Sequence, residues 1–74
     1  MKSPIKLKLI ITKNYDQFLT WCHENNVHPK DKFIRYVYKE DQLFGLHNCE
    51  VIYYGEYWKS PMFGSYFLDR VTKD

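Results

Sequence analysis

The feature that most constrains this chain is the alternation of β-forming runs with helix-forming stretches inside only 74 residues. Three runs rich in β-branched and aromatic residues are each followed by a segment with helical spacing or helix-capping residues. Strands that are separated by helices usually form a parallel sheet with right-handed crossovers. We therefore predict one small α/β domain over residues 1–74, with the chain order βαβαβα.

The three predicted strands are Ile5 to Thr12, Phe33 to Tyr38 and Cys49 to Tyr54. The first strand is the most apolar, and its second half reads as buried on both faces. It should therefore lie in the middle, which gives a small three-stranded sheet of order 2-1-3. The alternative is an α+β domain in which strands two and three are antiparallel, because the connection between them is near the minimum length for a parallel crossover.

The first predicted helix has the clearest signals. Asn14 occupies an N-cap position, and Gln17 stands three residues later, which is the capping-box arrangement. Asn25 and Asn26 suit the end of the helix, because Asn tolerates the left-handed conformation found there. The apolar residues at helical spacing are Tyr15, Phe18, Leu19 and Cys22, with Trp21 beside them.

Two further helical segments are predicted. A short helix or helical turn covers Lys39 to Leu46, with acidic residues at its start and Gly45 at its close. Ser60-Pro61 suits the start of a last helix, because Ser caps and Pro fixes the first turn. Gly64 weakens this helix by up to about 1 kcal/mol relative to Ala. The residues expected to face the sheet from it are Met62, Phe63, Tyr66, Phe67 and Val71.

The composition favours a binding protein. Aromatic residues make up 19% of the chain, as two Trp, seven Tyr and five Phe. A domain of this size cannot cover all of them, and exposed aromatic patches usually mark interfaces. We therefore expect a protein partner or a homodimer. The formal net charge of +2 is too small for a dedicated nucleic-acid-binding protein.

The sequence argues against the common catalytic and ligand sites. Three isolated glycines leave no phosphate-binding loop, so we expect no nucleotide cofactor. Neither cysteine has the spacing of a zinc site, so no metal is expected. One catalytic alternative remains, a small enzyme that uses His47 and Cys49, which share a face if the strand includes both. The simpler interpretation of this pair is a half-buried thiol beside a loop histidine, and we predict no catalytic residue.

The expected working surface is the edge where the strands of a parallel sheet end, because open α/β sheets bind their ligands there. Tyr57 and Trp58 follow the predicted strand end at Gly55, and Trp and Tyr are common interface anchors. The alternative for Trp58 is a cap over the core. The candidate partner-binding residues at this edge are Lys13, Asn14, Lys39, Tyr57, Trp58 and Lys59.

A second function class is a single-stranded nucleic-acid-binding module. Lysines interleaved with Tyr and Trp can form a surface on which bases stack and phosphates pair. Nearby acidic residues, among them Glu40, Asp41 and Glu56, oppose this reading. The lysines concerned are Lys6, Lys8, Lys13, Lys39 and Lys59.

The chain is expected in the cytoplasm. No apolar run approaches the roughly 18 residues of a membrane span, so no membrane association is predicted. The first residues lack the continuous apolar segment of a secretion signal. Both Cys22 and Cys49 are expected to be reduced thiols.

The chain resembles the small early proteins of phages that infect Gram-positive bacteria. The resemblance lies in its short length, its aromatic content, its frequent Lys, Asn and Tyr, and its lack of a catalytic motif. It resembles in particular the staphylococcal phage inhibitors of the host DNA sliding clamp, which act as dimers in the DNA channel of the ring. This implies a non-enzymatic host-takeover protein that binds and inhibits a host replication protein. No functional residue is carried over from this family. Gln42-Leu43-Phe44 is only weakly similar to a clamp-binding peptide, in which a Gln is followed by a spaced Leu and Phe.

Overall fold

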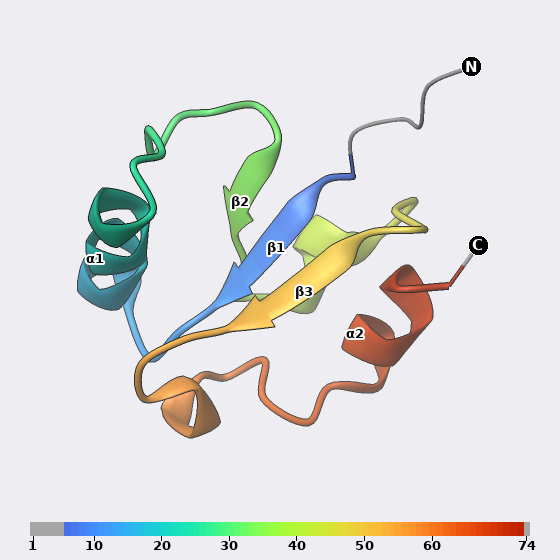
Figure 1. Cartoon of the computed structure of the whole chain (residues 1–74). Helices are drawn as coiled ribbons and strands as arrows, with labels where there is room; N and C mark the ends of the chain where they lie inside the picture. Colours follow the sequence, from blue (N-terminus) through green and yellow to red (C-terminus); the bar gives the residue numbers. More distant parts are fainter. Residues whose placement is uncertain (1–5, 74) are drawn as a thin grey trace, which may run out of the picture.

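The computed structural model describes residues 6–73, which form a three-stranded sheet with helices on both sides (Figure 1). Short 3₁₀ helices, labelled η, follow the second and third strands. The elements in chain order are β1 (Lys8–Ile11), α1 (Tyr15–Glu24), β2 (Ile34–Tyr36), η1 (Glu40–Leu43), β3 (Glu50–Tyr53), η2 (Tyr57–Lys59) and α2 (Tyr66–Val71).

The sheet is parallel and has the order β2-β1-β3, which confirms the predicted α/β fold and strand order. The central strand β1 pairs with β2 from Lys8 to Ile10 and with β3 from Lys8 to Ile11. Its position follows from composition, because a strand covered on both faces and at both edges must be apolar. The antiparallel alternative for the second and third strands is wrong.

All three strands are shorter than predicted. The first begins at Lys8 and ends at Ile11, and Ile5 lies outside the described residues. The second loses Phe33, Val37 and Tyr38, and the third loses Cys49 and Tyr54. β-branched and aromatic residues continue past the point where backbone pairing stops, so propensity alone overestimates strand length.

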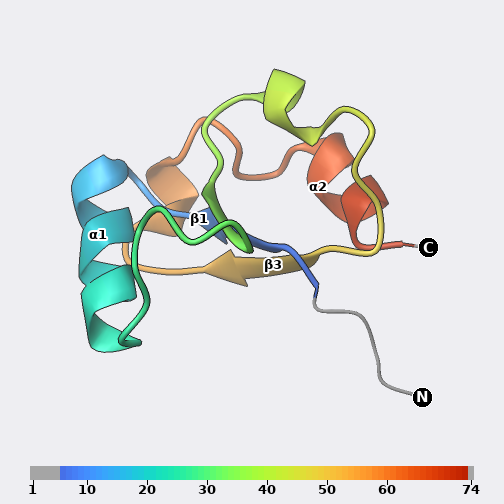
Figure 2. The same ribbon diagram turned by 90° about the horizontal axis from the view of Figure 1, so that it is seen from above.

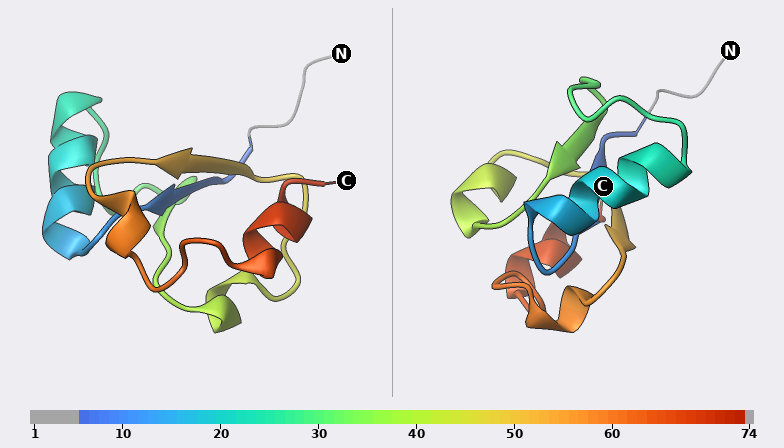
Figure 3. Two further views of the ribbon diagram at one scale, coloured as in Figure 1. Left: turned by 90° about the horizontal axis from the view of Figure 1, so that it is seen from below. Right: turned by 90° about the vertical axis from the view of Figure 1, so that its left-hand side faces the viewer.

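The two faces of the sheet carry separate cores. On one face Ile10 packs with Phe18, Trp21 and Cys22 of α1. On the other face Leu9 and Ile11 belong to a larger cluster, which η1, α2 and the connecting segments complete. Figure 2 shows η1 and α2 together on one side of the strands, and Figure 3 shows α1 at the opposite end of the molecule from α2. The residues of the larger cluster are Leu9, Ile11, Val37, Leu43, Cys49, Met62, Leu68 and Val71.

Helix α1 begins and ends at the predicted residues. The Asn14 side chain accepts a hydrogen bond from the Gln17 backbone N–H at 3.1 Å, which caps the helix. Asn25 is the C-cap, and Asn26 follows with a φ of 56°. Tyr15 and Leu19 stay largely exposed although their spacing places them on the apolar side.

The connection between β2 and β3 is held by one glutamine of η1. The Gln42 amide oxygen accepts from the backbone N–H groups of Tyr38 and Lys39, and its amide nitrogen donates to the Tyr36 carbonyl. These bonds give partners to the backbone groups that follow β2. A short connection that contains only η1 can therefore join β2 to the parallel strand β3. Leu43 is buried and Gln42 is partly buried, so Phe44 is the most exposed side chain of the Gln42-Leu43-Phe44 segment.

The last helix begins later than predicted. The Ser60 hydroxyl accepts from the Met62 N–H at 3.0 Å, but this bond closes a turn and no helix follows from Pro61. Gly64 adopts a φ of 82° and redirects the chain, and Ser65 then caps α2. Met62, Phe67 and Val71 contribute to the core as expected, whereas Phe63 and Tyr66 do not face the sheet.

Candidate functional site

The loops that follow β1 and β3 lie side by side at the carboxyl edge of the sheet (Figure 1). One residue of α1 joins them. The Gln17 amide oxygen accepts from the N–H of Lys13 at 3.1 Å and from the N–H of Glu56 at 3.0 Å. The capping-box interpretation of Gln17 is therefore wrong, because its side chain reaches the N–H of Lys13 and a distant loop, not that of Asn14.

Gly55 makes this contact sterically feasible. A Cβ atom at position 55 would lie 2.6 Å from the Gln17 amide oxygen, and the backbone there has a φ of 64°. Only glycine meets both conditions without strain. The close approach of Gly55 to Gln17 therefore holds the loop after β3 against the start of α1.

Three charged side chains gather at this edge. The Glu56 carboxylate lies 3.5 Å from the Lys13 ammonium and 3.4 Å from the Lys59 ammonium. The hydrogen bond from Lys59 and the positive charge of Lys13 hold the pKa of the Glu56 carboxyl below its ordinary value. The structure thus brings two of the predicted site lysines together around one acid, which cancels part of their charge.

Four aromatic side chains adjoin the charged group, and we call them the β3-end aromatic patch: Tyr53, Tyr57, Trp58 and Phe63. The Tyr57 ring is central, with centroid distances of 5.2 Å to Tyr53, 5.3 Å to Trp58 and 5.7 Å to Phe63. Tyr53, Trp58 and Phe63 are exposed to 48%, 54% and 50%. Trp58 is therefore not a cap over the core, because more than half of its surface faces solvent.

The side chains of the remaining two candidate residues make other contacts. The Asn14 side chain serves as the helix cap described above. The Lys39 ammonium lies 5.5 Å from the centre of the Tyr38 ring, beyond the end of β2. Within residues 6–73 no recorded ion pair or hydrogen bond connects Lys39 with Lys13, Trp58 or Lys59.

Four residues of this edge were not among the sequence candidates: Gln17, Tyr53, Glu56 and Phe63. The sequence predicts Phe63 on the sheet-facing side of a helix, and it predicts Tyr53 only as part of a strand, with no role in binding. The signal that Phe63 is exposed was Gly64, since a glycine with positive φ ends a turn more readily than it continues a helix. No sequence signal connects Gln17 with a loop almost forty positions away.

The two cysteines do not have the environment of reactive thiols. The Cys49 sulfur is buried and donates to the His47 backbone carbonyl at 3.5 Å, so the contact does not involve the imidazole. Burial raises the pKa of the Cys49 thiol, although the positive charge of Arg35 opposes the shift. A buried thiol with a raised pKa carries little thiolate at neutral pH, and thiolate is the nucleophile. This weighs against the enzymatic alternative.

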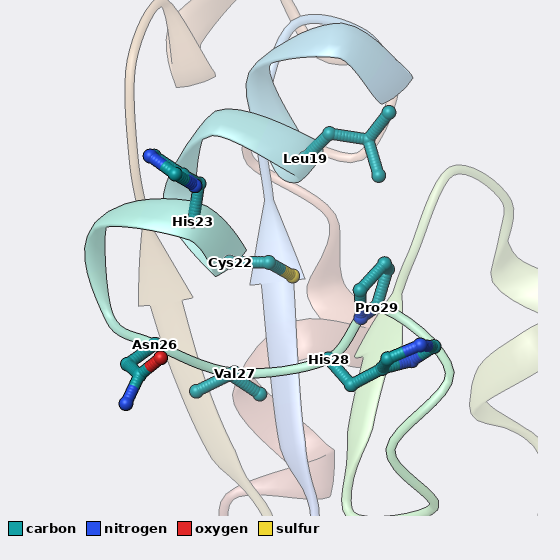
Figure 4. Close-up of a pocket in the computed structure, with 7 residues that line it drawn as sticks. All are labelled: Leu19, Cys22, His23, Asn26, Val27, His28 and Pro29. Carbon is teal, nitrogen blue, oxygen red and sulfur yellow. The ribbon is translucent and has the colours of Figure 1, made fainter.

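The other cysteine, Cys22, lies at the base of an open depression of about 460 Å³ near the end of α1. Figure 4 shows His23 and His28 on opposite sides of this depression, with neither ring directed at the Cys22 sulfur. Burial raises the pKa of Cys22, and the His28 ring accepts from the Lys30 N–H at 3.0 Å. Among the residues that the structure describes, no group of three metal-ligating side chains is close enough to hold an ion.

Neither helix within residues 6–73 has the length and apolar character needed to cross a membrane. Comparison of the chain with protein-family models, curated proteins and solved structures gives no match.

Proposed function

We propose that this protein is a non-enzymatic binding domain that engages a protein partner through the β3-end aromatic patch. The observation that carries the proposal is the contiguous exposure of Tyr53, Trp58 and Phe63 around Tyr57. Aromatic side chains offer large contact areas at small entropic cost, and Trp and Tyr dominate interface energetics. Lys13, Glu56 and Lys59 form a polar rim beside the patch, as interfaces commonly have.

The resemblance to phage host-takeover proteins adds a specific candidate partner. We propose that the protein inhibits a host DNA-replication protein in the cytoplasm of a Gram-positive bacterium, with the DNA sliding clamp as the first partner to test, and that it acts as a homodimer. Because Leu43 is buried and Gln42 is occupied by backbone groups, the Gln42-Leu43-Phe44 segment does not support a clamp-peptide mode of binding. The aromatic patch offers a different surface for that contact.

Capture from a Gram-positive lysate, followed by titration with purified sliding clamp, tests the proposal. The informative variant is Trp58→Ala, which should weaken binding at least thirtyfold, since an interface hot spot contributes about 2 kcal/mol or more. The matched control is Phe44→Ala, which removes another exposed aromatic ring, one that contacts Phe67 and is not part of the patch.

Recovery of no stoichiometric host protein would contradict the binding function. Equal loss of affinity in the two variants would contradict the assignment to the patch. If the Trp58→Ala variant still binds the partner and the Phe44→Ala variant does not, the partner contacts the Gln42-Leu43-Phe44 segment and not the patch.

A second candidate function is supported by a different surface. The rings of Tyr36 and Tyr38 are stacked at 5.5 Å, Tyr15 lies against Tyr36, and the Lys39 ammonium lies over Tyr38. Stacked aromatics with a lysine are typical of single-stranded nucleic-acid binding. Binding of a labelled oligonucleotide should then fall steeply with salt and be lost in Tyr38→Ala. No binding at low salt would remove this candidate.

A further inference from the structure

The outer edge of β3 presents backbone groups that lack a partner. The N–H groups of Glu50 and Tyr54 donate to Leu7 and Ile11, so these residues point toward β1. In a strand, alternate residues point to opposite edges, so Val51 and Tyr53 direct both N–H and C=O away from the sheet. Within the described residues, neither N–H of this pair donates a recorded hydrogen bond.

Just before β3, the same edge already forms hydrogen bonds with a backbone segment of this chain. Cys49 also points outward, and its N–H donates to the Val71 carbonyl at 2.8 Å, next to a bond from Asn48 to Lys73. The end of α2 thus covers the first part of this edge. Further along β3 the edge is no longer covered by α2. Val51 and Tyr53 instead lie beside a groove of about 460 Å³ between β3 and α2.

The groove has a definite chemical character. Its apolar surface includes Val51 and the Tyr53 ring, which places it in direct continuity with the β3-end aromatic patch. Asp69 is the charged residue that lines it, and its carboxylate lies 3.3 Å from the Lys73 ammonium in an exposed ion pair, so a basic side chain of the occupant would share this carboxylate with Lys73. Edge strands are commonly protected by short length, charge, proline, a bulge or a covering element. β3 is short and begins with the charged Glu50, but residues 51–53 carry no charge, proline or bulge, and the hydrogen bonds from α2 end at Cys49.

We propose that this edge binds an extended segment of a protein partner as a fourth strand, with apolar side chains on Val51 and Tyr53 and a basic side chain near Asp69. The inference rests on the proposed protein-binding function and assigns its mode of recognition. Main-chain hydrogen bonds to Val51 and Tyr53 hold the segment, and the aromatic patch receives the apolar side chain at its end. Strand addition of this kind separates affinity from specificity, because the backbone provides the former and side-chain pockets the latter.

The probe is a fluorescein-labelled Lys-Val-Lys-Val-Lys-Val-Lys peptide, and the control probe carries proline at its central position. Amide hydrogen exchange is followed residue by residue by NMR. We expect the alternating peptide to bind, to slow exchange at Val51 and Tyr53, and to leave the inward-facing amide of Ile52 unchanged. The proline peptide should bind about tenfold more weakly, since it loses a main-chain donor and distorts the strand.

Two protein variants sharpen the test. Chemical synthesis of the chain with an N-methyl group on Tyr53 removes one outward N–H and keeps the side chain, and it should weaken peptide binding about tenfold. Asp69→Asn should weaken it and reduce its salt dependence, whereas Asp16→Asn, which removes the same charge from α1, should leave both unchanged.

Three outcomes would overturn the inference. The first is no binding of the alternating peptide, and the second is binding without protection of Val51 and Tyr53. The third is a chain that self-associates in sedimentation with these two amides already protected, since a second copy then occupies the edge. Failure of the proposed function gives a different result. No host protein is then captured from the lysate, or Trp58→Ala does not weaken binding more than Phe44→Ala, whether or not the peptide binds. If capture succeeds but N-methyl-Tyr53 protein binds its partner like the parent, only the strand mode is wrong.

Discussion

The region around α1 and the region after β3 use the same residue types for different purposes. Phe18 and Trp21 of α1 are buried against the sheet, whereas Trp58 and Phe63 remain half exposed on turns after β3. The difference comes from the backbone. A ten-residue helix with caps at both ends can lie flat on the sheet, while the short η2 and the following turn cannot cover their own side chains.

This contrast shows that aromatic content by itself does not distinguish core from interface. In the α1 region each buried aromatic ring is packed against the sheet, and its loss should strongly destabilise the fold. In the β3-end region Tyr57 also packs against the larger core, but Tyr53, Trp58 and Phe63 are about half exposed, so the loss of one of these three rings should change binding and leave the fold. Variants in the two regions should therefore have opposite effects on stability and on partner binding.

The largest effect is expected from Phe18→Ala. Phe18 is almost completely buried between α1 and the sheet and lies 5.4 Å from the Tyr36 ring. Removal of a buried phenylalanine side chain costs about 3–5 kcal/mol, a large part of the stability of a small domain. Urea unfolding followed by far-ultraviolet circular dichroism measures the loss. A loss below about 1 kcal/mol would contradict the assignment of Phe18 to the core.

The next largest effect is expected where the two regions are joined. In Gly55→Ala the new methyl group must displace the Gln17 amide, so the protein should lose about 2–3 kcal/mol from backbone strain and broken hydrogen bonds. Gly45→Ala is the matched control, because Gly45 also has a positive φ but its Cβ would meet no atom within 4 Å. It should cost about 1 kcal/mol. Equal losses in urea unfolding would show that Gln17 does not hold the two loops together.

The same contrast explains which parts of the fold could be predicted from sequence. Helix α1 and the central place of β1 depend on local caps and apolar periodicity, and both predictions are confirmed. The predicted start of α2 at Ser60-Pro61 is wrong, because these two residues suit a turn as well as a helix. The choice between these depends on Gly64 and on the burial of Met62, which only the folded chain determines.

The candidate site was predictable in part. Residues next to each other in sequence, such as Tyr57, Trp58 and Lys59, could be assigned to one edge because a parallel sheet brings strand ends together. The pairing of Lys13 with Glu56 and the role of Gln17 depend on side-chain reach between distant segments. No spacing rule encodes such contacts, so they required the structure.

A smaller effect on stability is expected from Trp58→Ala. More than half of the Trp58 surface is exposed and its one recorded ring contact is with Tyr57, so its loss should cost less than about 1 kcal/mol. The variant should keep the circular dichroism spectrum of the parent while it loses the partner. A loss of stability comparable to that of Phe18→Ala would show that the patch belongs to the core and would remove the contrast between the two regions.

The smallest effect concerns the charged rim of the patch. The folded-state pKa of Glu56 is lowered, first by the hydrogen bond from Lys59 and then by the charge of Lys13. A carboxyl with a lowered pKa stabilises the folded state above its unfolded pKa, and this contribution is lost as the pH falls through the folded-state pKa. Lys59→Met should therefore raise the pKa of Glu56 more than Lys13→Met, as measured by carbon-detected NMR titration. Since all three side chains are exposed, high salt should reduce the difference between parent and variants. A Glu56 pKa that is the same in the parent and both variants would show that the lysines do not face this carboxylate in solution, and the two ammonium groups would then be free to contact an acidic partner.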